Sequence, residues 1–176
     1  MEKINGTPII ELLLNRLSKS KKIDQIVIAI PLDEKNKSLE NHLQEKNYKI
    51  YKGSENNVLE RYFFAAKEYN ANVIIRITGD CPLIDPGLID DCLEEYESLD
   101  IDYLCNNYPP SFPDGLDVEI FSFQSLQKAY NLAVSKFDLE HVTPFIRNSP
   151  DFSKFTFKSK TNLSHVRLTL DEKEDF

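Results

Sequence analysis

The residue best suited to chemistry in this chain is Asp80, which follows Gly79 at the end of an apolar run. Residues 73–78 are rich in β-branched side chains, which is typical of a buried parallel strand. Ligands of parallel α/β sheets bind beyond the carboxyl ends of the strands. Because Mg²⁺ takes carboxylate oxygens and keeps phosphate and water as other ligands, Asp80 is a candidate Mg²⁺ ligand at a phosphoryl site. The alternative is a turn aspartate that caps the next helix.

A second candidate is the polar loop at 53–61, which leads into a predicted helix and holds Ser54, Asn57 and Arg61. Backbone amides at a helix start and side chains of these types suit a nucleobase edge or a phosphate. The pattern alone favours the alternative, an ordinary loop that caps the helix.

A third candidate is the run of three carboxylates at Asp114, Asp117 and Glu119. Strand spacing would place Asp117 and Glu119 on one face, where they could bind sugar hydroxyls, and a solvated strand edge is an equal alternative. His141 lies where a helix begins and could meet a carboxylate or a phosphate, although a structural histidine is the commoner case.

The predicted elements that position these residues alternate between helix and strand. Apolar spacing predicts helices at residues 8–19, 38–47, 58–69, 86–96 and 123–134. Strands are predicted at residues 23–30, 48–51, 73–78, 103–106 and 118–121, with an edge strand at 152–158. For the helix at 86–96, Asp85 is the expected N-cap, with Pro86 at the first helical position. This order predicts a parallel α/β sheet with right-handed crossovers.

Composition excludes several classes of function. The 21 basic against 29 acidic residues give a net charge of -8, which would repel a nucleic-acid backbone, so no nucleic-acid partner is expected. The three cysteines lack the close spacing of zinc or disulfide sites, which indicates a reducing compartment. No apolar run approaches the roughly 20 residues that span a bilayer. We therefore expect a soluble cytoplasmic protein with no membrane partner.

Five longer motifs carry a resemblance to a known family. They lie, in order, at residues 53–62, 76–85, 112–121, 140–147 and 163–171, and so extend over most of the chain. In them the sequence resembles the cytidylyltransferases of spore-coat polysaccharide synthesis, which are relatives of CMP-KDO synthetase and acylneuraminate cytidylyltransferase. The resemblance implies a three-layer α/β, Rossmann-like nucleotidyltransferase fold, similar to that of glycosyltransferase-A enzymes, with a mostly parallel central sheet.

The same resemblance implies an enzyme of the CMP-sugar synthetase type, with CTP and a sugar, expected to be acidic, as substrates for cell-surface polysaccharide synthesis. The sugar hydroxyl attacks the α-phosphate of CTP and pyrophosphate leaves, with Mg²⁺ as cofactor. By analogy, Asp80 and Asp171 are the catalytic metal ligands. The nucleotide-binding residues would be Ser54, Asn57, Arg61, Arg76 and Gly79. The sugar-binding residues would be Asp114, Asp117, Glu119 and His141.

The N-terminus departs from the family pattern. The family begins with a strand and a loop of the type Q-A-R-x-x-S-x-R-L-P-G-K, which holds the triphosphate, and only four residues here precede the matching segment that starts at Asn5. We therefore expect one nucleotidyltransferase domain over residues 1–176 that lacks this strand and loop, with a final helix as a second candidate for a missing element. Two alternatives stay open, a non-catalytic or truncated binding or assembly module and a nucleotidyltransferase that uses another NTP. A homodimer is one oligomeric state that the sequence leaves open.

Overall fold

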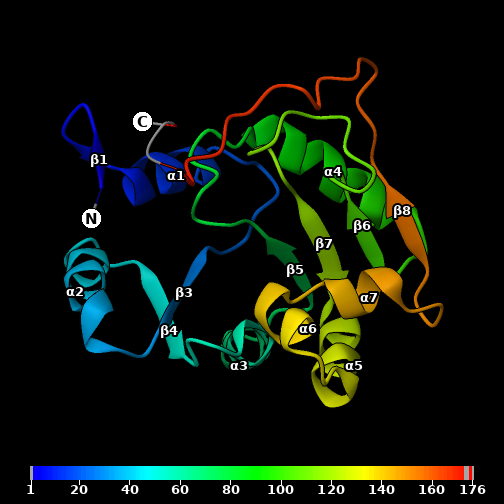
Figure 1. Ribbon diagram of the computed structural model, residues 1–176, viewed down its shortest axis with the longest axis horizontal. Helices are drawn as coiled ribbons and strands as arrows, with labels where there is room; N and C mark the ends of the chain where they lie inside the picture. Colours follow the sequence, from blue (N-terminus) through cyan, green and yellow to red (C-terminus); the bar gives the residue numbers. More distant parts are fainter. Residues whose placement is uncertain (1, 173–174, 176) are drawn as a thin grey trace. The chain divides into compact units, whose positions relative to one another are not determined.

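The computed structural model describes residues 2–172 and 175, and these form two compact units. Unit 1 comprises residues 2–24, 75–120 and the described part of 154–175, and unit 2 comprises residues 25–74 and 121–153. The chain passes from one unit to the other several times, so each unit is built from segments that are distant in the sequence (Figure 1).

Unit 1 begins with an antiparallel hairpin and contains two of the longer helices. Its elements are β1 (Lys3–Ile4), β2 (Thr7–Pro8), α1 (Ile9–Leu17), α4 (Pro86–Ser98), β6 (Tyr103–Cys105) and β8 (Lys154–Thr156). Strands β6 and β8 pair in parallel, and α4 packs against β6. Asp85 caps α4 by accepting the backbone N–H of Gly87 at 2.8 Å, with Pro86 in the first turn, as predicted. The buried side of α4 consists of Leu88, Ile89, Cys92, Leu93 and Tyr96.

Unit 2 contains a parallel strand pair and most of the helices. Its elements are β3 (Val27–Pro31), the short 3₁₀ helix η1 (Glu34–Asn36), α2 (Lys37–Glu45), β4 (Lys49–Gly53), α3 (Val58–Glu68), α5 (Phe123–Leu132), α6 (Lys136–His141) and α7 (Pro144–Asn148). Strands β3 and β4 run in parallel register from Val27 opposite Lys49. Stacked rings join α3 to α5, because the Phe63 ring lies 4.3 Å from Tyr130 and 5.6 Å from Phe123, centroid to centroid. Phe63 is buried, so these ring contacts help to hold α3 against α5.

Two strands, β5 (Val73–Arg76) and β7 (Glu119–Ser122), each contain one of the four points where the chain changes unit. They belong to a four-stranded sheet in the order β5-β7-β6-β8. Strand β5 leads directly to the Asp80 loop and β7 starts directly after the 114–118 segment. Two of the predicted site segments, the Asp80 loop and residues 114–118, are therefore attached to neighbouring strands of this sheet.

The fold is mixed α/β, as predicted, but the sheets of the described residues are small. They contain two, two and four strands in place of one large sheet, and the expected mostly parallel central sheet is not confirmed. The physical reason lies in how the strands pair. Strands β3 and β4 pair with each other in a separate sheet, and β1 and β2 form an antiparallel pair. The short helix α6 was not predicted, and the helix start expected at His141 is wrong by three residues, because α6 ends at His141 and α7 begins at Pro144. In the described chain, none of the helices combines the length and the apolarity that a membrane span needs.

Candidate active site

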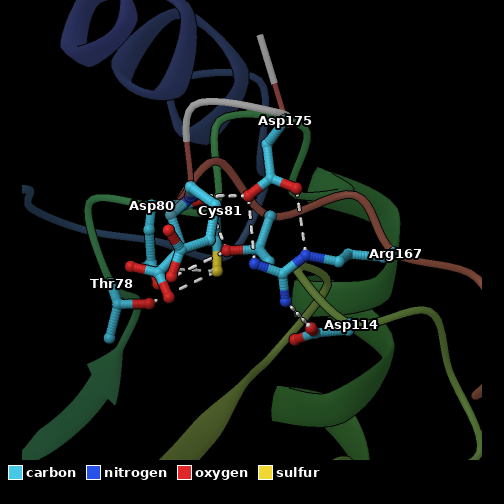
Figure 2. Close-up of polar contacts among 9 residues, drawn as sticks. Thr78, Asp80, Cys81, Asp114, Arg167 and Asp175 are labelled. Atoms are coloured by element: carbon cyan, nitrogen blue, oxygen red, sulfur yellow. Dashed lines mark hydrogen bonds and ion pairs between the residues drawn. The ribbon is translucent and has the colours of Figure 1, made fainter.

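The Asp80 loop is held in place by the next residue, Cys81, which is buried. After β5 the chain turns at Gly79 and Asp80, and the Cys81 backbone N–H donates to the Thr78 carbonyl at 3.2 Å. Cys81 is buried, and burial raises the pKa of its thiol to about 12. A Cβ on Gly79 would meet no atom within 4 Å, so the space beside this glycine is open. The loop thus presents a half-buried Asp80 carboxylate next to the buried Cys81 (Figure 2).

The C-terminal segment is hydrogen-bonded directly to the Asp80 loop. The Leu170 backbone N–H donates to the Asp80 carbonyl at 2.8 Å, and the buried Thr169 hydroxyl donates to the same oxygen at 3.0 Å. Asp171 comes next and is exposed. From ordinary backbone dimensions, the Cα atoms of Asp171 and Asp80 lie within roughly 10 Å of each other. The structure therefore brings together the two segments that carry the predicted metal ligands.

The Asp114 loop is joined to the same C-terminal segment. The Asp114 backbone N–H donates to Val166 at 2.9 Å, and its carbonyl accepts from Leu168 at 2.7 Å. Gly115 has φ +97°, and a Cβ there would lie 2.5 Å from the Thr169 nitrogen. Glycine is thus required at 115, because both the backbone angle and the close passage of the neighbouring chain exclude a side chain. Residues 166–170 connect the Asp114 and Asp80 loops.

Arg167 lies between two aspartates (Figure 2). Its Nε and Nη2 donate to the two Asp175 carboxylate oxygens, each at 3.0 Å, and its Nη1 donates to Asp114 at 2.9 Å. These charge-assisted bonds lower the pKa of the Asp175 carboxyl and raise the pKa of the Arg167 guanidinium. Sequence reasoning missed a role for both residues. Arg167 lies inside a family-like motif, but its pairing with Asp175 is a tertiary contact that no periodic pattern reveals.

The carboxylates of unit 1 repel one another at Asp117. Burial is the largest cause that raises the pKa of Asp117, and the negative charges of Asp114, Glu119 and Asp80 raise it further. A hydrogen bond from Asn107 acts in the opposite direction. The repulsion by these charges adds to the effect of burial in keeping the Asp117 carboxyl protonated to a higher pH than a free aspartate.

Glu119 is held in a buried ion pair. Arg76 Nη1 donates to Glu119 Oε2 and the Tyr103 hydroxyl donates to Oε1, each at 2.5 Å, and the Glu119 side chain is 3% exposed. Burial and the neighbouring Glu119 charge raise the pKa of Tyr103. These contacts give Arg76 and Glu119 a structural part in unit 1. Their predicted roles in binding nucleotide and sugar stay predictions.

In unit 2, the predicted nucleotide residues form the start of α3. The Ser54 hydroxyl accepts the Asn57 backbone N–H at 3.0 Å, Asn57 Oδ1 caps the helix by accepting from Glu60 at 2.9 Å, and Arg61 donates to the Ser54 carbonyl at 2.7 Å. Burial lowers the pKa of Arg61. The capping alternative is therefore observed, and the nucleotide role of Ser54, Asn57 and Arg61 stays a prediction.

His141 ends α6 on the surface of unit 2, with its ring 4.5 Å from that of Phe137. The next residue, Val142, has φ 71° and ψ −57°, and the Thr143 N–H donates back to the His141 carbonyl at 2.8 Å. This is a strained γ-turn at a buried β-branched residue. It fixes the direction of the chain directly after His141, whose sugar role stays a prediction.

Two curated relatives match almost the whole chain. An uncharacterized protein of Methanocaldococcus jannaschii is 36% identical over 177 aligned residues, which cover 99% of this chain and 72% of the relative. The spore coat polysaccharide biosynthesis protein SpsF of Bacillus subtilis is 30% identical and is matched over 98% of this chain and 74% of its own length.

Solved structures of related proteins match the chain over most of its length. A cytidylyltransferase from Leptospira borgpetersenii is 31% identical with a TM-score of 0.93, covering 98% of this chain and 74% of that one. CMP:2-keto-3-deoxy-manno-octonic acid synthetase, solved in complex with CTP, has a TM-score of 0.65 at 15% identity over 90% of this chain and 82% of that one, which shows a shared nucleotidyltransferase fold. A family model described as cytidylyltransferase matches residues 1–175. The chain belongs to the cytidylyltransferase family.

Proposed function

We propose that this protein transfers CMP from CTP to a hydroxyl group of an acidic sugar, for use in cell-surface polysaccharide synthesis. The sugar oxygen forms a bond to the α-phosphorus, the bond from the α-phosphorus to the bridging oxygen breaks, and pyrophosphate leaves. The hydroxyl proton passes to a carboxylate or to water. Family membership supports the nucleotide, and the relative named for spore coat polysaccharide biosynthesis supports the pathway class.

The observation that carries the proposal is the bond from the Leu170 N–H to the Asp80 carbonyl. It supports a shared site because the next residue, Asp171, supplies a second carboxylate beside Asp80. A triphosphate is strongly anionic, so it approaches a pair of carboxylates only with a cation between them. This juxtaposition is more informative than any single motif.

The donor set fits Mg²⁺. This cation is commonly held by one or two carboxylates and keeps water and phosphate as its remaining ligands. The described residues contain no cluster of three or more metal-ligating side chains, which suits such an open site better than a closed structural one. Among the described residues, the Asp80 carboxylate is contacted by the Thr169 hydroxyl at 3.4 Å and by the Cys81 sulfur at 3.7 Å, both long distances. Bound at Asp80 and Asp171, Mg²⁺ would neutralise charge on the triphosphate and the leaving pyrophosphate.

Other residues of the chain bind and orient the substrates in this proposal. Asp114 and Asp117 accept hydrogen bonds from sugar hydroxyls, because an ionised carboxylate has only acceptors. The raised pKa of Asp117 suits it to receive a proton from such a hydroxyl. The remaining assignments follow the family resemblance: nucleotide at Ser54, Asn57, Arg61, Arg76 and Gly79, and sugar also at Glu119 and His141.

Both units lie within the residues that the family model matches, and we propose that they make up one nucleotidyltransferase domain. The non-catalytic binding or assembly module is not favoured, because the chain belongs to an enzyme family and presents its two aspartates on adjoining segments. The homodimer and the cytoplasmic location stay predictions.

The test is a panel of nucleotides and sugars, with pyrophosphate release and the nucleotide sugar product both measured. We expect CTP with an acidic sugar to give equal amounts of pyrophosphate and CMP-sugar, and ATP, GTP and UTP to give little. If only neutral sugars gave product, the substrate would be a neutral sugar and the proposed acidic sugar would be wrong. Folded protein that gives no product from CTP with any sugar of the panel would contradict the proposal.

A further inference from the structure

The ion pair of Arg167 with Asp175 has no place in the proposed chemistry, yet it lies beside a proposed metal ligand. The guanidinium uses two nitrogens on the two Asp175 oxygens, each at 3.0 Å, in the planar two-point arrangement that fixes both partners. The Asp175 side chain is only 14% exposed. A pair with this geometry holds its position better than an ordinary surface ion pair.

The same Asp175 carboxylate also holds the backbone at Asp171. Its Oδ2 accepts the N–H of Asp171 at 2.9 Å and that of Glu172 at 2.8 Å, while the Asp175 N–H donates to the Glu172 carbonyl at 3.1 Å. With the two bonds from Arg167, the carboxylate accepts four hydrogen bonds. Its oxygens are therefore used for structure and are poorly suited to bind a metal themselves.

The position of this contact along the chain matters. Residues 166–170 are fixed by bonds to the Asp114 and Asp80 loops, and the last of these bonds is at Leu170. Within the described residues, the Asp175 carboxylate is what holds the backbone of Asp171 beyond that point. Figure 2 shows the Arg167 guanidinium joined to Asp175 on one side and to Asp114 on the other.

We propose that Arg167 and Asp175 are positioning residues that orient Asp171 toward the metal site. They act through the Asp171 backbone: Asp175 holds the backbone N–H groups of Asp171 and Glu172, and Arg167 holds Asp175. The inference rests on the proposed function, since it assumes that Asp171 binds the metal with Asp80. Partners of this kind orient metal ligands, and their loss typically weakens metal binding by about 10- to 100-fold.

The test measures Mn²⁺ binding to the full chain by water-proton relaxation, without substrates. We expect Asp175→Asn and Arg167→Ala to weaken Mn²⁺ binding by about tenfold or more. Arg167→Lys keeps the charge without the planar two-point contact, so we expect an intermediate loss of Mn²⁺ binding. This variant replaces Arg167→Ala in the test if Arg167→Ala does not fold. Lys160→Ala, an exposed basic residue of the same segment, is the matched control with unchanged binding.

A double-mutant cycle distinguishes positioning from general destabilisation. If Asp175 acts through Asp171, the effect of Asp175→Asn on Mn²⁺ binding disappears in an Asp171→Asn background. In turnover, Asp175→Asn should raise the Mg²⁺ concentration for half-maximal rate and leave the KM for the sugar within about twofold. A raised sugar KM at saturating Mg²⁺ would instead indicate direct substrate contact and overturn the proposal.

The positioning role of Asp175 and the metal site itself can be tested separately. If folded Asp175→Asn binds Mn²⁺ like the wild type while Asp80→Asn and Asp171→Asn do not, the positioning role is wrong and the metal site stands. If Asp171→Asn also binds Mn²⁺ like the wild type, the proposed metal site itself is wrong.

Discussion

The backbone N–H of Leu170 donates to the carbonyl oxygen of Asp80 at 2.8 Å, across 90 positions of the sequence. This bond joins the loop after β5 to the segment that carries Asp171. Because each of these segments contributes one proposed metal ligand, the geometry of the site depends on how firmly residues 166–170 are held. The Asp114 loop holds the other end of the same segment, through Val166 and Leu168.

Gly115→Ala should destabilise the protein and weaken the site together. The new Cβ would lie 2.5 Å from the Thr169 nitrogen and 2.6 Å from the Leu168 carbonyl carbon, and these backbone atoms cannot turn aside. We expect the free energy of unfolding to fall by about 3 kcal/mol, the sum of strain at positive φ and displacement of the neighbouring chain.

Gly6→Ala is the matched control for this change. Gly6 also has a positive φ, +82°, but a Cβ there meets no atom within 4 Å. Urea unfolding should show a loss of only about 1 kcal/mol, from the backbone angle alone. Equal losses at Gly6 and Gly115 would mean that the contact with Thr169 carries no energetic weight.

Glu119→Gln should lower the free energy of unfolding substantially, although the two side chains have nearly the same shape. The substitution removes the negative charge that faces Arg76 in the interior and weakens the acceptor for Tyr103. Breaking a buried pair in this way costs about 3 kcal/mol in the free energy of unfolding.

Glu97→Gln provides the comparison, since Glu97 pairs with Lys22 at 3.5 Å on the surface of the same unit. Exposed pairs of this kind contribute less than about 1 kcal/mol. If urea unfolding gives the same loss in the free energy of unfolding for both variants, Glu119 is better hydrated than its 3% exposure indicates.

The Cys92 thiol should make the protein less stable in alkali. Burial is the main cause that raises its pKa to about 12, against about 8.5 in an unfolded chain. The unfolded state therefore loses this proton first, and stability falls as the pH rises through 8.5 toward 12. Between pH 8 and pH 10 the loss from this one thiol is about 2 kcal/mol.

Cys92→Ala isolates this contribution, because its packing cost does not depend on pH. We expect the wild type to lose about 2 kcal/mol more than Cys92→Ala between the two pH values in urea unfolding. Parallel pH profiles for the two proteins would show that the thiol ionises as easily in the folded state as in the unfolded one.

Elements with a long periodic pattern were predictable from the sequence. The helices predicted at 58–69 and 86–96 appear as α3 and α4, because each repeats its apolar side chains over several turns and starts at a capping residue, Asn57 or Asp85. The helices α6 and α7 have only six and five residues, too few for such a pattern to be visible. The strained turn at Val142 between them requires a conformation that no β-branched residue favours.

The site was predictable to the extent that chemistry follows residue type. Asp80 and Asp171 were selected from a strand end and from a motif, and their segments do adjoin. What surrounds them depends on tertiary contacts. The burial of Glu119 with Arg76 results from strand pairing, and the contact of Arg167 with Asp175 is a tertiary contact without a periodic pattern, so neither was visible in the sequence.

The most direct test of the account compares Asp80→Asn with Asp91→Asn, an exposed aspartate on α4 in the same unit, in CTP-dependent pyrophosphate release with an acidic sugar and Mg²⁺. Loss of a metal ligand removes charge stabilisation that is worth several kcal/mol in the transition state, so Asp80→Asn should lose at least about 100-fold in kcat/KM. Asp91→Asn should stay within about twofold of the wild type. Equal rates for folded Asp80→Asn and the wild type would contradict the central claim that Asp80 holds the metal for CMP transfer.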